Sequence, residues 1–264
     1  MTSPTDFSRR LGIEHPIIAG AMYPCSNPEL VAAASNSGGI GIVQPISLTY
    51  VHQYDFRAGL RYIRELTDKP IGLNLLIERS SKKYLEKNKA WLEIAIEEGV
   101  RFFITALGNP QWVTKRLANV KDACVFHDVT NGHWAQKAIS AGVDGLICVN
   151  DRAGGHAGTL SPQALFDQLQ SLGLPLICAG GIGGQQAYQQ ALDIGYAGVQ
   201  LGTRMIATQE CSAHQDYKQA IIGAGENDIA LTKKLTGVPV SVIKTDYMRQ
   251  RGMQTSRLAN WALK

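Results

Sequence analysis

The chain has 264 residues, of which 45% are hydrophobic and 18% are charged, a composition typical of a folded globular protein that excludes a disordered chain. The formal net charge is only +4 and the basic residues are scattered, so we predict no nucleic-acid partner. No apolar run reaches the ~18 residues of a membrane-spanning helix, so no membrane partner is expected.

Short apolar runs typical of β-strands alternate with amphipathic stretches along the first half of the chain. The predicted strands are 16–22, 40–44, 70–76 and 101–107. The predicted helices are 27–39, 55–67 and 82–99. In the first helix, Asn27 is a candidate N-cap, Pro28 suits the first turn and Gly38 can end the helix.

The same alternation continues through the second half. The predicted helices are 109–120, 131–142, 161–173 and 184–195, and the predicted strands are 123–129, 144–150, 175–183 and 197–204. Eight strand–helix units in ~250 residues favour a single-domain α/β fold, a (β/α)8 TIM barrel over residues 1–264. An open doubly wound sheet is the alternative. From about residue 241 we predict a basic helical tail, which packs as a last helix or supports a homodimer contact.

Five widely spaced cysteines predict a reducing compartment without disulfides. The first residues lack the apolar core of a signal peptide, so we expect a cytoplasmic protein. Cys25 follows the first strand closely, and a packed thiol is favoured over a reactive one there.

Two glycine-rich stretches follow the last two predicted strands. They are "AGGIGG", with Gly180 and Gly181, and "LGTR", with Gly202 and Thr203. In a barrel, the active site lies at the carboxyl ends of the strands, and the loops after strands seven and eight often bind phosphate. Glycine lets backbone N–H groups approach an anion closely. We therefore predict a phosphorylated ligand here, the alternative being glycines that only form tight turns.

Two further polar side chains fall near predicted strand ends. Asn74 interrupts the apolar strand "IGLNLL", and its amide suits either a ring with N–H and C=O groups or a neighbouring loop. His156 lies in "NDRAGGHAGTL", where an imidazole can exchange a proton near neutral pH. His133 is expected on a helix surface. No spacing of metal ligands and no nucleophile or Walker signature is present, so no metal site is predicted.

Several sequence blocks occur together in a fixed order. They are "HPIIAGAMYPCSNPELVAAASNSGGIGIV", "GLNLL", "AGGHAG", "CAGGIG" and "VQLGTR". Together they resemble the nitronate monooxygenase (2-nitropropane dioxygenase-like) family of flavin-dependent barrels. The resemblance implies non-covalently bound FMN, with His156 as the catalytic residue near the flavin and the substrate. The cofactor-binding residues that we assign on this basis are Ala21, Met22, Asn74, His127, Gly155, Ala179, Gly180, Gly181, Gln200, Gly202 and Thr203.

The resemblance favours an FMN-dependent oxidoreductase that oxidises nitronates with O2 to carbonyl compounds and nitrite. An NAD(P)H-dependent flavin, quinone or enoyl-thioester reductase of the same fold is an alternative. A flavin-free phosphate-binding isomerase or lyase is an alternative of another class, and a non-catalytic flavin carrier is a further one. The expected partners are a small-molecule substrate and O2, with NAD(P)H in the reductase alternative.

Overall fold

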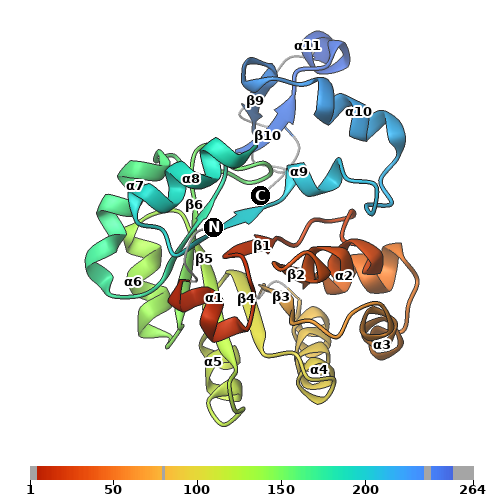
Figure 1. Ribbon diagram of the computed structural model, residues 1–264, viewed down its shortest axis with the longest axis vertical. Helices are drawn as coiled ribbons and strands as arrows, with labels where there is room; N and C mark the ends of the chain where they lie inside the picture. The colour runs from red at the N-terminus through yellow and green to blue at the C-terminus, as the bar shows by residue number, and fades with distance from the viewer. Residues whose placement is uncertain (1–4, 79–80, 235–238, 252–264) are drawn as a thin grey trace.

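Eight parallel strands close into a barrel in the computed structural model, which describes residues 5–78, 81–234 and 239–251 (Figure 1). Strand β1 pairs with both β2 and β8, so the sheet has no open edge. The strands of the barrel are β1 (Ile17–Ala19), β2 (Ile40–Val43), β3 (Ile71–Ile77), β4 (Phe102–Leu107), β5 (Cys124–Val129), β6 (Gly145–Val149), β7 (Leu176–Ala179) and β8 (Gly198–Leu201). The predicted (β/α)8 barrel is confirmed, and closure between β1 and β8 excludes the open sheet.

The helices are α1 (Asp6–Leu11), α2 (Pro28–Asn36), α3 (Phe56–Leu66), α4 (Lys82–Glu97), α5 (Gln111–Leu117), α6 (Gly132–Ser140), α7 (Pro162–Leu169), α8 (Gln185–Ile194), α9 (Thr203–Ile206), α10 (Gln215–Gly223) and α11 (Asp246–Arg251). Helices α2 to α8 lie around the strands in Figure 1, and the other helices lie towards the ends of the molecule. Among the described residues, none of these helices is both long and apolar enough to span a membrane.

An antiparallel hairpin follows the barrel, made of β9 (Ile229–Thr232) and β10 (Val240–Ile243). It lies with α10 and α11 at one end of the molecule (Figure 1). The sequence predicted a helical tail from about residue 241, but the chain there is first a strand and then α11. The rest of the predicted tail, 252–264, lies outside the described residues. That the whole chain is one domain stays a prediction.

The buried core has an inner and an outer layer. The inner layer fills the barrel with residues such as Ile42, Ile104 and Ile177. The outer layer, which includes Leu73 and Val125, packs between the strands and the helices. Because successive side chains of a strand point to opposite faces, this division shows which residues of each strand face inward.

Helix α1 closes the amino-terminal end of the barrel. The ring of Phe7 lies 6.1 Å from the ring of Phe102 and 5.5 Å from that of Phe126. Thr5 caps this helix, its hydroxyl accepting a hydrogen bond from the Ser8 N–H at 3.2 Å. With this end filled by aromatic side chains, the opposite end is where a ligand can enter.

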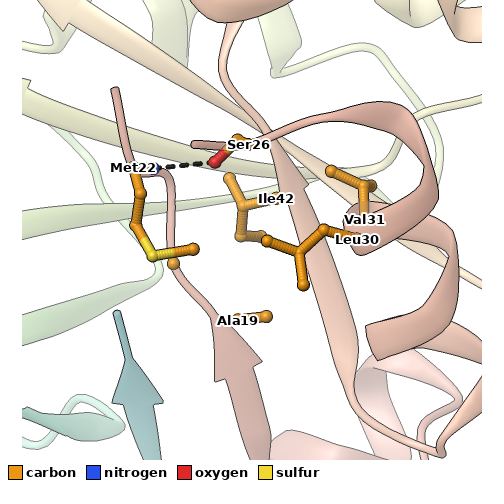
Figure 2. A pocket seen from close by; sticks show the side chains of 7 residues that line it. Ala19, Met22, Ser26, Leu30, Val31 and Ile42 are labelled. Atoms are coloured by element: carbon orange, nitrogen blue, oxygen red, sulfur yellow. Dashed lines mark hydrogen bonds between the residues drawn. The ribbon is translucent and has the colours of Figure 1, made fainter. Parts of the chain in front are cut away.

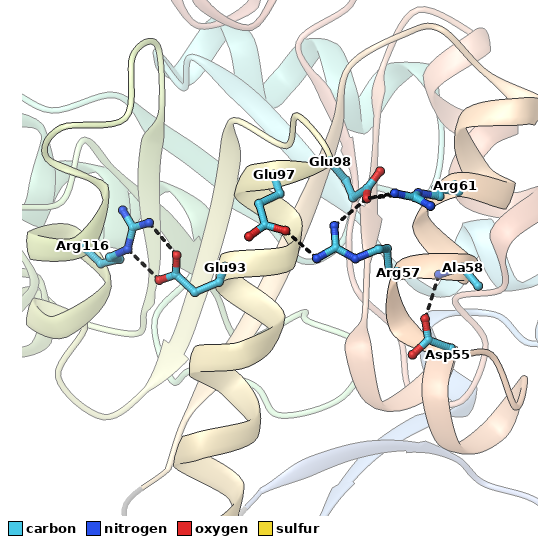
Figure 3. A network of polar contacts seen from close by, with 8 residues as sticks. All are labelled: Asp55, Arg57, Ala58, Arg61, Glu93, Glu97, Glu98 and Arg116. Atoms are coloured by element: carbon cyan, nitrogen blue, oxygen red, sulfur yellow. Dashed lines mark hydrogen bonds and ion pairs between the residues drawn. The ribbon is translucent and has the colours of Figure 1, made fainter.

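Ion pairs connect the neighbouring helices α3, α4 and α5 on the outer surface (Figure 3). Arg57 of α3 contacts Glu97 at 2.5 Å and Glu98 at 2.8 Å, at the end of α4. Arg116 of α5 contacts Glu93 of α4 at 2.5 Å. The hydrogen bond from Arg57 is the main cause that lowers the pKa of Glu98. Ion pairs on the surface add little stability individually.

Candidate active site at the carboxyl end of the barrel

The β7 exit forms a tight glycine turn. Gly180 has φ +124° and Gly181 has φ +76°, conformations that favour glycine. A Cβ on Gly180 would lie 2.3 Å from Asn150 Oδ1. A Cβ on Gly183 or Gly184 would meet nothing within 4 Å, so the last part of the turn is open to a ligand.

Asn150, at the end of β6, joins the β6 and β7 exits. Its Nδ2 donates a hydrogen bond to the Gly180 carbonyl at 3.0 Å, and its Oδ1 accepts one from the Arg152 N–H at 2.8 Å. Its side chain is fully buried. Sequence reasoning missed this role, which depends on contacts between residues thirty positions apart.

Two arginines lie beside the glycine turn. The Arg204 guanidinium donates a hydrogen bond to the Gly183 carbonyl. The Arg152 side chain passes Gly181, where a Cβ would lie 3.1 Å from its atoms, and pairs with Glu226. Arg204 places positive charge next to the open backbone, which suits an anionic phosphate, whereas the charge of Arg152 is paired with that of Glu226. Arg204 directly follows the predicted "LGT" exit, but sequence reasoning gave it no role.

At the β8 exit, the glycine-rich stretch directly follows the strand. Gly202 is the N-cap of α9, which begins at Thr203. A Cβ on Gly154 would lie 2.2 Å from Thr203 Oγ1, so the loop after β6 packs directly on this exit. The exits of β6, β7 and β8 therefore form one continuous surface.

At the β1 exit, Met22 uses its backbone groups internally. Its N–H donates to Ser26 Oγ at 2.8 Å, and its carbonyl accepts from the Ser26 N–H at 2.8 Å. Figure 2 shows the first of these bonds beside a small apolar pocket, which Ile42 and Leu30 also line. The Met22 N–H is thus already bonded, and the Met22 side chain lies 3.8 Å from where a Gly202 Cβ would be, beside the β8 exit. Ala21 packs against the inner core layer.

Inward-facing polar side chains line the upper part of the barrel. Asn74 is 7% exposed, and the outer-layer residues Leu73 and Leu75 flank it, so it faces inward. Gln200 faces inward by the same alternation, beside Ala179 on the neighbouring strand. Its Oε1 is buried and has no hydrogen-bond partner among the described residues. These groups are available to the polar edge of a ring.

On β5, His127, which we assigned to the cofactor, does not face the barrel interior. His127 shares the outer face with Val125 and Val129, and its Nδ1 lies 2.8 Å from Thr105 Oγ1. Burial lowers its pKa to about 4, so it is a neutral side chain of the outer layer rather than a group facing the barrel interior. Asp128 faces inward instead. Burial raises its pKa to about 7, and its Oδ1 has no partner in the described part of the chain.

The loop that carries His156 packs closely on the barrel and pairs with the hairpin. Gly154 and Gly158 allow close packing, because a Cβ on Gly158 would lie 2.4 Å from the Val149 carbonyl oxygen. Gly155 has φ +107° and open space where a Cβ would be. Its segment pairs with the hairpin through an antiparallel bridge between His156 and Val240. The His156 side chain is exposed at this end of the molecule.

The cysteines do not contribute to this surface. All five are buried and free. Cys25 packs with Leu30, Ile206 and Cys211, and burial raises its pKa to about 11. It is therefore a packed, neutral thiol, as the sequence favoured. Within the described ranges, no cluster of His, Cys, Asp and Glu is placed to hold a metal ion.

These features fit a phosphorylated flavin. The glycine turns at Gly180 and Gly202, together with Arg204, suit its phosphate. The Gln200 amide oxygen, which has no partner in the described part of the chain, and the Asn74 amide suit the polar edge of an isoalloxazine ring.

Comparisons with known proteins agree with this site. Residues 5–262 match the family model described as nitronate monooxygenase. A nitronate monooxygenase from Pseudomonas aeruginosa is 31% identical, over 88% of this chain and 77% of that protein. A relative from Rhodococcus jostii, named (3aS,4S,5R,7aS)-5-hydroxy-7a-methyl-1-oxo-octahydro-1H-indene-4-carboxyl-CoA dehydrogenase, is 29% identical, over 93% of this chain and 67% of that protein.

Solved structures show the same fold. FabK from Thermotoga maritima superposes with a TM-score of 0.81 and 30% identity, covering 94% of this chain and 77% of that one. A nitroalkane oxidase from Streptomyces ansochromogenes has a TM-score of 0.77 at 22% identity, covering 91% and 80%. The chain therefore belongs to the nitronate monooxygenase family and is an FMN-dependent oxidoreductase.

Proposed function

We propose that the chain oxidises small alkyl nitronates with O2 to carbonyl compounds and nitrite. The observation that carries the proposal is the position of the His156 loop, which packs on Thr203 at the β8 exit. This contact puts the imidazole segment beside the glycine turns that suit the FMN phosphate. The nitronate monooxygenase from Pseudomonas aeruginosa, at 31% identity, supports the same substrate class.

In the proposed reaction, the substrate is the nitronate anion, and His156 is the residue that contacts it. FMN, when bound, supplies an electron acceptor that O2 can reoxidise. His156 donates a hydrogen bond or proton to a nitro oxygen of the nitronate, and so stabilises the negative charge that leaves as nitrite. The apolar inner layer below excludes water. Two nitronate anions and one O2 give two carbonyl compounds and two nitrite ions, which balances atoms and charge.

Replacing His156 tests this role. His156→Ala should bind FMN like the unaltered protein, because the glycine turns remain, but it should lose most nitrite formation from propionate 3-nitronate, about 10²-fold or more. His133→Ala is the matched control, since His133 is exposed on α6. Unchanged turnover in His156→Ala would remove the imidazole from the mechanism.

A second candidate function, a reductase, is suggested by a relative whose name includes a CoA thioester. The relative from Rhodococcus jostii is a carboxyl-CoA dehydrogenase, so an NAD(P)H-dependent reductase acting on an enoyl thioester or quinone is the alternative. Anaerobic mixing separates the two. Bleaching of the flavin by nitronate alone supports the monooxygenase, whereas rapid bleaching by NADPH alone supports the reductase. NAD(P)H use, a homodimer and a cytoplasmic location stay predictions.

A colourless protein that does not take up FMN would contradict both functions. That result would favour the flavin-free isomerase or lyase instead. The absorbance spectrum after addition of FMN is therefore the first measurement.

A further inference from the structure

The hairpin β9–β10 contacts the His156 loop through Ser241. The Ser241 N–H donates a hydrogen bond to the Gly155 carbonyl at 2.8 Å. Its side-chain hydroxyl donates a second one to the Ala153 carbonyl at 2.6 Å. One residue of β10 thus holds carbonyl groups on the amino-terminal side of His156, and the bridge between Val240 and His156 continues the pairing.

The base of the same loop is held separately by the barrel. The Gly158 N–H donates to the Asn150 carbonyl at 3.0 Å, and the Asp151 N–H donates to the Leu160 carbonyl at 2.9 Å. These bonds fix where the loop leaves and rejoins the barrel. They do not involve Gly155 or His156, so the orientation of this upper segment depends on other contacts, among them those with Ser241.

The hairpin itself has a limited core. An isolated pair of strands is marginally stable in water, and Leu231 and Ile229 of β9 are 47% and 41% exposed. The hairpin therefore depends on docking, and Ser241 lies where it docks on the loop. A second contact joins the same two regions, because Glu226, just before β9, pairs with Arg152.

We propose that Ser241 is a positioning residue for His156, which holds the imidazole segment at the distance and angle that the reaction requires. The inference rests on the proposed function, since it assumes that His156 contacts the substrate. General acid–base catalysis requires heavy atoms about 2.6–3.2 Å apart. A misplacement of about 1 Å costs on the order of 10²-fold in rate. Removing the hydroxyl of Ser241 breaks its hydrogen bond to the Ala153 carbonyl and replaces no residue of the predicted phosphate site.

The test compares Ser241→Ala with Ser241→Thr, which keeps the hydroxyl, and with the control Ser140→Ala. The Ser140 hydroxyl donates to the Gln136 carbonyl at 2.9 Å within α6, so the control loses a similar bond elsewhere. The first readout is amide hydrogen exchange of the 151–160 segment in the protein without substrate. In Ser241→Ala we expect exchange there to be about 3- to 10-fold faster, the effect of losing one hydrogen bond. Exchange in the barrel strands should not change.

The second readout is steady-state kinetics with propionate 3-nitronate. In Ser241→Ala we expect kcat to fall roughly tenfold, with little change in KM or in FMN content, and Ser241→Thr should restore kcat. Unchanged exchange and kcat in Ser241→Ala would overturn the inference. A general increase in exchange over the barrel would also overturn it, because Ser241 would then only stabilise the fold. If no variant and not even the unaltered protein consumes nitronate, the proposed function fails, and the exchange result alone decides whether Ser241 holds the loop.

Discussion

The neighbouring side chains His127 and Asp128 lie on opposite faces of β5, because successive side chains of a strand alternate between its two faces. His127 lies in the outer layer and is neutral, since burial lowers its pKa to about 4. Asp128 faces the barrel interior, and burial raises its pKa to about 7. Both shifts follow from the same cause, which disfavours the charged form of each group. Their effects on the pH dependence of stability have opposite signs.

The signs follow from proton binding in the folded and unfolded chains. Between about pH 4 and 7, folded Asp128 keeps a proton that the unfolded chain has lost, so this carboxyl makes stability fall as pH rises. Between about pH 4 and 6.5, folded His127 lacks a proton that the unfolded chain holds, so this imidazole makes stability rise with pH. The two contributions oppose each other in the shared range.

Asp128→Asn should therefore change the pH profile of stability. The variant loses the Asp128 contribution, so its free energy of unfolding should rise more steeply than that of the unaltered protein between about pH 4 and 6.5. The stability of Asp128→Asn relative to the unaltered protein should be greatest above pH 7, because only the unaltered protein then has to bury an ionised carboxylate. Urea unfolding at several pH values measures this. A difference between the two proteins that is constant with pH would contradict the burial of Asp128.

At the scale of elements, the position of Asn27 at the start of α2 was predicted correctly, but the function of its side chain was not. It is the N-cap residue of α2, as predicted, but its side chain makes no capping hydrogen bond. Instead, Nδ2 donates to the Glu210 carbonyl at 2.8 Å, and Oδ1 accepts from the Ser212 N–H at 3.0 Å. The amide thus ties the segment after α9 to the start of α2.

Asn27→Ala should cost more than an ordinary lost cap. Asn27 is 2% exposed and makes two hydrogen bonds to the segment after α9, each worth about 0.5–1.5 kcal/mol, so their loss should cost about 1–3 kcal/mol. The comparison is Asn131→Ala, because Asn131 caps α6 by accepting from the Trp134 N–H and is worth about 1 kcal/mol. Urea unfolding of both variants measures the difference. A smaller loss for Asn27→Ala than for Asn131→Ala would show that the tether contributes little.

The same scale shows what the sequence could predict. All eight barrel strands and the glycine exits after β7 and β8 were predicted, because buried parallel strands form apolar runs and glycine marks tight turns. The hairpin was missed, since its strands have four residues each and are partly exposed. The orientation of His127 was not predicted correctly, for another reason. A shift of one residue in a strand exchanges the two faces, and an apolar run buried on both faces does not reveal which is inner.

At the scale of the whole molecule, the candidate site combines residues from the first and the second half of the chain. Asn74 and the β1 exit come from the first half of the chain, whereas the glycine turns and the His156 loop come from the second. The pairing of β1 with β8 brings these halves together, and the Gly20 N–H donates to the Leu201 carbonyl at 2.8 Å directly at the site. A ligand that binds across this junction should stabilise the closed barrel as a whole.

Bound FMN should therefore raise the melting temperature. At a concentration of 100 times Kd, binding to the folded state alone adds about 2.7 kcal/mol, which corresponds to roughly 5–10 °C for a chain of this size. Riboflavin has the same ring without the phosphate, so its effect at the same concentration should be much smaller. Arg204→Ala should reduce the FMN effect towards that of riboflavin, because the guanidinium lies beside the open glycine turn. Thermal melts of both proteins with each flavin measure this. Equal shifts with FMN and riboflavin would show that the β7 and β8 exits do not bind the phosphate, even if the ring is bound.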